Sequence, residues 1–227
     1  MKSTSQSEKE YKDWFDQENK DVFMEEIEYY KVIGSLLKGK KSVDLGCGYG
    51  SIETFSPDTV GVDFSEVALE RARKRGIKNL VKADIQKLPF KDDEFEISLS
   101  NGVLEHIEDI EKAISEMVRV SEIQIIIVHA ALPYGLELIR KPLMKLFGFK
   151  DQPIENPQTL KSMKNYLEKY GARIIIEGVW NYIDLRWISE NIPYGFLKWP
   201  SHHFLVSIKT KNLGRKFLGK HDFSSTE

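Results

Sequence analysis

Three glycines stand at alternate positions directly after an aspartate in "VDLGCGYG", residues 43–50. Glycine loses more conformational freedom on folding than any other residue, so such a cluster is unfavourable unless the backbone must turn tightly or approach another molecule closely. We therefore expect a ligand to bind against Gly46, Gly48 and Gly50. Asp44 precedes them, and its negative charge would repel a diphosphate but attract a cationic ligand.

The known glycine-rich phosphate loops match this stretch poorly. A P-loop needs a lysine followed by serine or threonine after its last glycine, and neither is present here. A dinucleotide-binding loop usually reads GxGxxG, whereas this one reads GxGxG with Ser51 where the third glycine would stand. The sequence excludes the first class and disfavours a nucleotide-linked oxidoreductase.

Short β-branched runs alternate with amphipathic segments along the rest of the chain. The runs expected as strands are 41–46, 59–64, 79–84, 94–100, 123–130, 172–180 and 202–210. Helices are expected at 65–76, 107–120 and 158–171, with one or two more between 11 and 37. Strands that alternate with helices predict βαβ units and a doubly wound sheet with ligands at the carboxyl ends of its strands.

The glycine loop resembles motif I of the class I S-adenosylmethionine-dependent methyltransferases, and later segments agree with this family in order and spacing. "GVDFS" resembles the second motif, and "ADIQKLPFKDDEFEISLSNGVLEHIEDIEKAISEMVRV" resembles the third and fourth motifs of the small-molecule-type, type 11-like subgroup. The resemblance covers roughly residues 40 to 130. It implies an α/β, Rossmann-like, doubly wound sheet of seven mostly parallel strands, with the last strand antiparallel and helices on both faces.

Two departures from the family pattern stand out. "SIETFSPDT" after the glycine loop leaves room for only one or two helical turns where the family often has a full helix. "SEIQ" replaces the family's longer turn before the fifth strand, so the connection after Val120 is expected to be tight.

The resemblance implies S-adenosylmethionine as the cofactor. Asp63 would hold the ribose hydroxyls, since ionised carboxylates form strong hydrogen bonds, and Asp84 would accept from the adenine amino group. The only cysteine, Cys47, is expected to fill space between two glycines and not to act as a nucleophile. The expected cofactor-binding residues are Tyr11, Trp14, Asp44, Gly46, Cys47, Gly48, Asp63, Phe64, Asp84, Ile85, Ser100 and Asn101.

Methyl transfer from a sulfonium is an in-line displacement, so alignment and water exclusion dominate, and a base is needed only when the acceptor must lose a proton. The sequence has no obvious catalytic motif, and the candidates are His106, His129 and Tyr134. The alternative roles are shaping of the pocket for His106 and a place in the core for His129. No metal is expected, because His202 and His203 are adjacent on a strand and diverge.

The expected organisation is one methyltransferase domain at 11–210. The segment 11–38, with "YKDWF", resembles an aromatic-bearing helix that closes over the cofactor in some members of the family; ordinary amphipathic packing is the alternative. A disordered tail is expected at 1–10 and a basic tail at 211–227. Inserts are expected at 132–157 and 181–201.

Aromatic residues are frequent in both inserts, which favours a planar, amphipathic or cationic small-molecule acceptor. RNA or protein methylation, or a non-catalytic cofactor-binding regulatory subunit, are the alternatives. Lys and Arg number 33 against 35 Asp and Glu, so the charge gives no reason to expect nucleic acid or a membrane as the main partner. The single cysteine and the lack of a long apolar run favour a cytoplasmic protein. A monomer or homodimer is expected.

Overall fold

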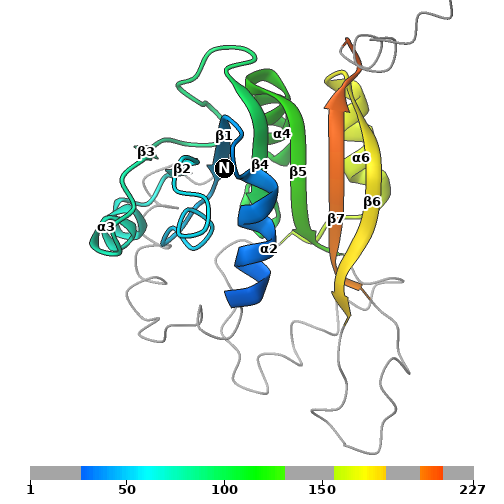
Figure 1. Ribbon diagram of the computed structural model, residues 1–227. Coiled ribbons are helices and arrows are strands. Elements are labelled where there is room, and N and C mark those ends of the chain that lie inside the picture. Colours follow the sequence, from blue (N-terminus) through cyan, green and yellow to red (C-terminus); the bar gives the residue numbers. More distant parts are fainter. Residues whose placement is uncertain (1–26, 131–155, 183–199, 212–227) are drawn as a thin grey trace, which may run out of the picture.

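The computed structural model describes residues 27–130, 156–182 and 200–211, and a seven-stranded sheet forms its centre (Figure 1). The strands are β1 (Ser42–Leu45), β2 (Val60–Asp63), β3 (Leu80–Lys82), β4 (Phe95–Asn101), β5 (Ser121–His129), β6 (Ala172–Tyr182) and β7 (Pro200–Lys209). Their order is β3-β2-β1-β4-β5-β7-β6. The first five strands pair in parallel, and β7 is antiparallel to both β5 and β6. The predicted fold class is confirmed.

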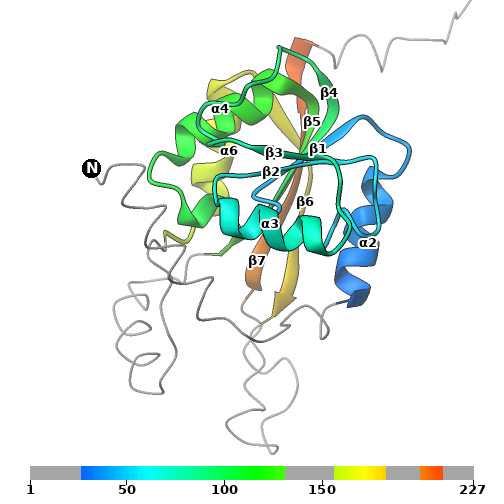
Figure 2. The ribbon, with the colours of Figure 1, turned by 90° about the vertical axis from the view of Figure 1, so that its left-hand side faces the viewer.

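Helices cover both faces of the sheet, as predicted. They are α2 (Ile27–Leu37), α3 (Glu66–Lys74), the 3-10 turn η2 (Leu104–His106), α4 (Ile110–Val120) and α6 (Leu160–Lys169). Figure 2 shows α4 and α6 on one side of the strands and α2 on the other. Within the described residues, none of these helices combines the length and the hydrophobicity needed to cross a membrane.

Local side-chain bonds fix the helix ends. Ser65 caps α3 by accepting a hydrogen bond from the Ala68 amide at 3.3 Å, and Asp109 caps α4 by accepting from the Lys112 amide at 3.0 Å. β5 begins at Ser121, the residue directly after α4, where the Ser121 hydroxyl donates to the Met117 carbonyl at 2.9 Å. This confirms the tight connection expected after Val120.

The core has two parts, one on each face of the sheet. The larger part packs α4 and α6 against β1, β2 and β5, and the smaller part packs α2 against β4 and β5. β5 contributes to both, because Ile126 and Val128 face the larger part while Ile125 and Ile127 face the smaller. This strand is therefore buried on both faces, as its continuous apolar run at 123–130 favours.

Helix α2 lies against the short segment that follows the glycine loop. No helix forms within residues 51–59, and a Cβ on Gly34 of α2 would lie only 2.7 Å from the Phe55 Cβ. Ile52 from this segment joins Ile33 and Leu37 of α2 in the smaller core. Close packing of α2 therefore helps to cover the face that lacks the family's full helix.

Most of the predicted accessory segments lie outside the described residues. These are the tail at 1–10, the first part of the lid at 11–38, most of the inserts at 132–157 and 181–201, and most of the tail at 211–227. α2 is the described part of the predicted lid.

Docking of α2 can be tested by truncating its inward face. Ile33 is fully buried, whereas its neighbour Val32 is 48% exposed. Ile33→Ala should lower the free energy of unfolding by about 2 to 5 kcal/mol, through lost burial and a cavity. Val32→Ala, the matched control, should change it by less than about 0.5 kcal/mol. Urea denaturation measures both, and equal losses would contradict the assigned orientation of α2.

Candidate functional site at the carboxyl ends of the strands

The glycine loop leaves β1 and is held against the end of β2. The amides of Gly46 and Cys47 both donate to the Val62 carbonyl, at 2.7 and 2.9 Å. Gly46, Gly48 and Gly50 all have positive φ, at 86°, 53° and 74°. Residues other than glycine adopt such φ values at a cost, so the turn itself explains part of the glycine pattern.

The three glycines differ in what surrounds them. A Cβ on Gly46 would lie 2.4 Å from Cγ2 of Val103, and one on Gly50 would lie 2.6 Å from Cγ1 of Ile77. A Cβ on Gly48 would meet no atom of the described residues within 4 Å. Packing therefore requires glycine at Gly46 and Gly50, whereas Gly48 presents its backbone to open space that a ligand can enter.

Asp63, the last residue of β2, ties this loop to the next one. Its Oδ2 accepts from the Gly48 amide at 3.0 Å and its Oδ1 accepts from the Ser65 amide at 2.8 Å. Burial raises the pKa of Asp63, and these amide bonds oppose the rise. Each carboxylate oxygen has a second lone pair, so Asp63 can still accept from a hydroxyl of a ligand beside Gly48.

The residues predicted to contact a purine lie after β2 and β3. Asp84 accepts from the Gln86 amide at 2.8 Å and is half-buried, as is Phe64. The Ile85 side chain is only 5% exposed and belongs to the larger core, so it offers little surface to a ring. Contact of these residues with a purine stays a prediction.

A buried pair of acids lies beneath the glycine loop. Asp44 on β1 and Glu53 are 2% and 0% exposed. A Cβ on Gly61 of β2 would lie 2.9 Å from Oε1 of Glu53 and from Sγ of Cys47, so this glycine makes room for both side chains. The sequence analysis missed Glu53, because a single glutamate in a polar segment is usually exposed.

Burial changes the ionisation of this cluster. It raises the pKa of Asp44 well above its usual range, helped by Glu53, and raises the pKa of Glu53 to about 7. Burial and the nearby acids also raise the pKa of the Cys47 thiol. Cys47 therefore stays protonated, which supports the packing role predicted for it.

The two residues at the end of β4 point to opposite faces of the sheet. Ser100 is fully buried. Asn101 is half-buried, and its Oδ1 accepts a hydrogen bond from the hydroxyl of Tyr29 on α2. The sequence analysis expected Tyr11 and Trp14 to reach the site, and both lie outside the described residues. Tyr29, which it missed, brings α2 to the site through a hydrogen bond between residues that are 72 positions apart in the sequence.

Two of the predicted catalytic candidates meet at Glu105. The His129 amide donates to Oε1 of Glu105 at 3.2 Å, and Nε2 of His106 lies 4.0 Å from the same oxygen. The third candidate, Tyr134, lies outside the described residues.

The His129 ring also stacks on His202 of β7, with centroids 5.4 Å apart and planes at 28°. Burial, together with His129 and His203, lowers the pKa of His202 to about 4, so this imidazole is neutral at physiological pH. The sequence analysis missed this pair, because it depends on the register that places His129 opposite His202. Among the described residues, no three His, Cys, Asp or Glu side chains are arranged to bind a metal ion.

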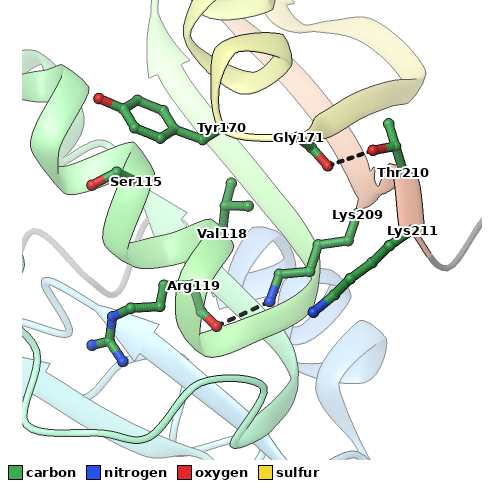
Figure 3. A pocket seen from close by; sticks show the side chains of 8 residues that line it. All are labelled: Ser115, Val118, Arg119, Tyr170, Gly171, Lys209, Thr210 and Lys211. Atoms are coloured by element: carbon green, nitrogen blue, oxygen red, sulfur yellow. Dashed lines mark hydrogen bonds between the residues drawn. The ribbon is translucent and has the colours of Figure 1, made fainter.

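A hollow of about 370 Å³ lies at the opposite, amino-terminal edge of the parallel strands (Figure 3). It is lined by Ser115, Val118, Arg119, Tyr170, Gly171, Lys209, Thr210 and Lys211. Its cations are already paired, since Lys209 and Lys211 contact Asp93 and Arg119 contacts Glu116. This hollow lacks the glycine loop and the strand-end acids, and we do not assign it to the site.

Comparisons with known proteins agree with this geometry. Residues 43–124 match the family model described as a methyltransferase domain. An uncharacterized protein of Methanocaldococcus jannaschii is 40% identical over 111 residues, which cover 49% of this chain and 52% of the relative. The chain therefore spans about half the length of this curated relative, and less of the other first relatives.

Two solved structures share the fold at low identity. A putative methyltransferase of Haloferax volcanii, in complex with the Trm112 methyltransferase activator, aligns with a TM-score of 0.63 at 15% identity, covering 89% of this chain and 97% of its own. The magnesium protoporphyrin IX methyltransferase of Synechocystis, with bound SAH, aligns with a TM-score of 0.59 at 15% identity, covering 88% and 93%.

The buried acids predict an unusual dependence of stability on pH. A carboxyl group whose pKa is raised in the folded state binds more protons in the folded protein than in the unfolded chain. Its contribution to the free energy of unfolding is therefore complete below the unfolded-state pKa and is lost as pH rises through the folded-state pKa. For Glu53 this loss falls between pH 4.5 and about 7. Glu53→Gln should therefore be more stable than the wild type at about pH 8, by roughly 1 to 3 kcal/mol, and similar to it at about pH 4.

Urea denaturation at both pH values measures this difference. Glu70→Gln, the same change at an exposed position on α3, is the control and should follow the wild type. A Glu53→Gln difference that does not vary with pH would show that the Glu53 carboxyl is not perturbed.

Proposed function

Since the chain carries, at residues 43–124, a methyltransferase domain of the class I S-adenosylmethionine-dependent family, we propose that it transfers a methyl group from S-adenosylmethionine to a small-molecule acceptor. The observation that carries the proposal is the open space at Gly48, bordered by the carboxylate that ends β2. We further propose that the protein acts in the cytoplasm as a monomer or homodimer and without a membrane partner.

The residues at this edge fit the chemistry of the cofactor. Gly48 lets the backbone approach the methionine portion, and Asp63 offers acceptor oxygens to the ribose hydroxyls. The acids Asp44 and Glu53 give the loop a negative surrounding that suits a sulfonium and an ammonium group. When bound, the cofactor supplies a methyl group on a positively charged sulfur.

The protein's own contribution would be alignment, exclusion of water and, for some acceptors, removal of a proton. Asn101 is oriented by Tyr29 where the family lines the cofactor near its methyl group. The imidazole of His129, whose backbone amide donates to Glu105 and whose ring stacks on the neutral His202, could take a proton from an acceptor hydroxyl or ammonium. His106 lies close to the same carboxylate and would shape this wall of the site.

A small-molecule acceptor is supported by the near-neutral charge of the chain and by the neutral His202 imidazole beside the strand ends. The second candidate is a macromolecular acceptor, RNA or protein. It is favoured by one observation, the 37% identity over 87 residues to a human protein described as a probable tRNA methyltransferase.

The proposal is tested by binding and turnover on the purified chain. Calorimetry should show binding of S-adenosylmethionine and of its demethylated product, and no binding of NAD. Turnover against a metabolite panel and against bulk RNA, read as release of demethylated cofactor, should favour the metabolites. Preference for RNA with a steep salt dependence would replace the small-molecule acceptor with the macromolecular one. Binding without any turnover would favour a regulatory subunit, and binding of NAD alone would overturn the family assignment.

The effect of Gly48 on ligand binding can be separated from the effect of its backbone conformation on stability. Gly48→Ala should destabilise the fold only by about 1 kcal/mol, the cost of a left-handed alanine, because the added methyl meets no atom within the described part of the chain. It should weaken cofactor binding by more than about tenfold, because the methyl enters the space assigned to the ligand.

Gly76→Ala is the matched control for this substitution. Gly76 also has positive φ with nothing near its Cβ position, but it lies past the end of α3. It should lose similar stability and keep its affinity, as measured by calorimetry. If both variants bind the cofactor equally well, the cofactor does not bind in the space beside Gly48.

A further inference from the structure

Asp44 and Glu53 form an enclosed acid pair whose charge the surrounding residues leave largely unbalanced. Among the described residues, Oδ1 of Asp44 and both carboxyl oxygens of Glu53 are buried without a hydrogen-bond partner. The two carboxyl groups lie close enough for each to change the pKa of the other. Burial of carboxylates without donors is strongly unfavourable, so the pair must either keep a proton or face a cation.

Among the charged groups that act on the pair in the described part of the chain, Arg75 is the one cation. Asp63 carries the same sign as the pair, and the Cys47 thiol is neutral. Arg75 lowers the pKa of Glu53, but its guanidinium donates to the Tyr49 carbonyl at 3.2 Å and the residue is exposed. The acids around the pair therefore outnumber the cation that acts on it. The pair lies directly beneath the loop that carries Gly48.

We propose that Glu53, acting with Asp44, is a specificity-determining residue that favours the cationic, methyl-carrying cofactor over its neutral demethylated product. The inference rests on the proposed function. The two forms of the cofactor share their amine, carboxylate, ribose and purine, and they differ in the methyl group and in the charge on sulfur. A buried negative charge near the methionine portion attracts the sulfonium and gives no such advantage to the thioether.

Because the two acids share a proton, the charge of the pair can respond to the charge of the bound ligand. With the cationic cofactor bound, the pair would release its proton to solvent, and its negative charge would balance the sulfonium charge. With the product bound, the pair would take a proton back from solvent, since an unbalanced buried charge is unfavourable. After transfer the sulfur is neutral, so the same pair would weaken the hold on the product and help its release.

The experiment compares both ligands on two matched variants. Calorimetry measures the affinity for S-adenosylmethionine and for S-adenosylhomocysteine in the wild type, in Glu53→Gln and in Glu70→Gln. Glu53→Gln should weaken S-adenosylmethionine binding by about tenfold and leave S-adenosylhomocysteine within about twofold. Glu70→Gln, on the exposed side of α3, should change neither.

A second measurement uses the wild type alone, in case Glu53→Gln does not fold. The ratio of the two affinities should shift toward S-adenosylmethionine as pH rises from about 5.5 to about 8.5, because the pair becomes more negative. The amine and carboxylate common to both ligands cancel in this ratio.

Each outcome decides the question. Equal losses for both ligands in Glu53→Gln, or a ratio that stays constant with pH, would overturn the selectivity assigned to Glu53 while leaving the proposed function in place. If neither ligand binds the wild type, it is the proposed function that fails.

Discussion

The site depends on the way the chain after β1 is fastened to the end of β2. The carbonyl of Val62 receives two successive amides, and the carboxylate of Asp63 receives a third from Gly48. Such a tight fastening forces the loop into left-handed conformations, and it is the physical reason for glycine at these positions. The register of β1 and β2 is equally fixed, since a shift by one residue would exchange Asp44 with the core residues Val43 and Leu45.

Strand alternation places the polar groups of the site on the face that α2 covers. Asp44 is the register partner of Leu99, and Asn101 is the partner of Ile127; both partners belong to the smaller core beneath α2. His129, two residues beyond Ile127, lies on the same face. α2 therefore has two roles, because Ile33 completes the core while Tyr29, one turn earlier, reaches Asn101. Ordering of α2 and ordering of the site are physically linked.

Local patterns in the sequence predicted the fold well. The order of strands and helices, the Ser65 cap and the burial of β5 on both faces all follow from residues within a few positions of one another. The glycine loop was found from the spacing of its glycines, and the strand-end acids were found from the family resemblance. By contrast, Glu53, Tyr29 and His202 were missed, since each acquires its role from a partner on another element. A single sequence carries no signal for such pairings until the register of the sheet is known.

The distribution of charge separates this site from those of diphosphate-binding proteins with related sheets. Three acids, Asp44, Glu53 and Asp63, are buried within or beside the glycine loop. The cations around the hollow in Figure 3 lie at the far edge of the sheet and are held by acids of their own. A ligand that enters beside Gly48 therefore meets a negative environment, because the amides of Gly46, Cys47 and Gly48 already donate to the Val62 carbonyl and the Asp63 carboxylate. A diphosphate would be repelled there, whereas a ligand that combines hydroxyls with a positive charge finds carboxylate acceptors and an opposite charge. The glycine loop leaves space for a ligand to bind, and the buried acids determine which kind of ligand binds there favourably.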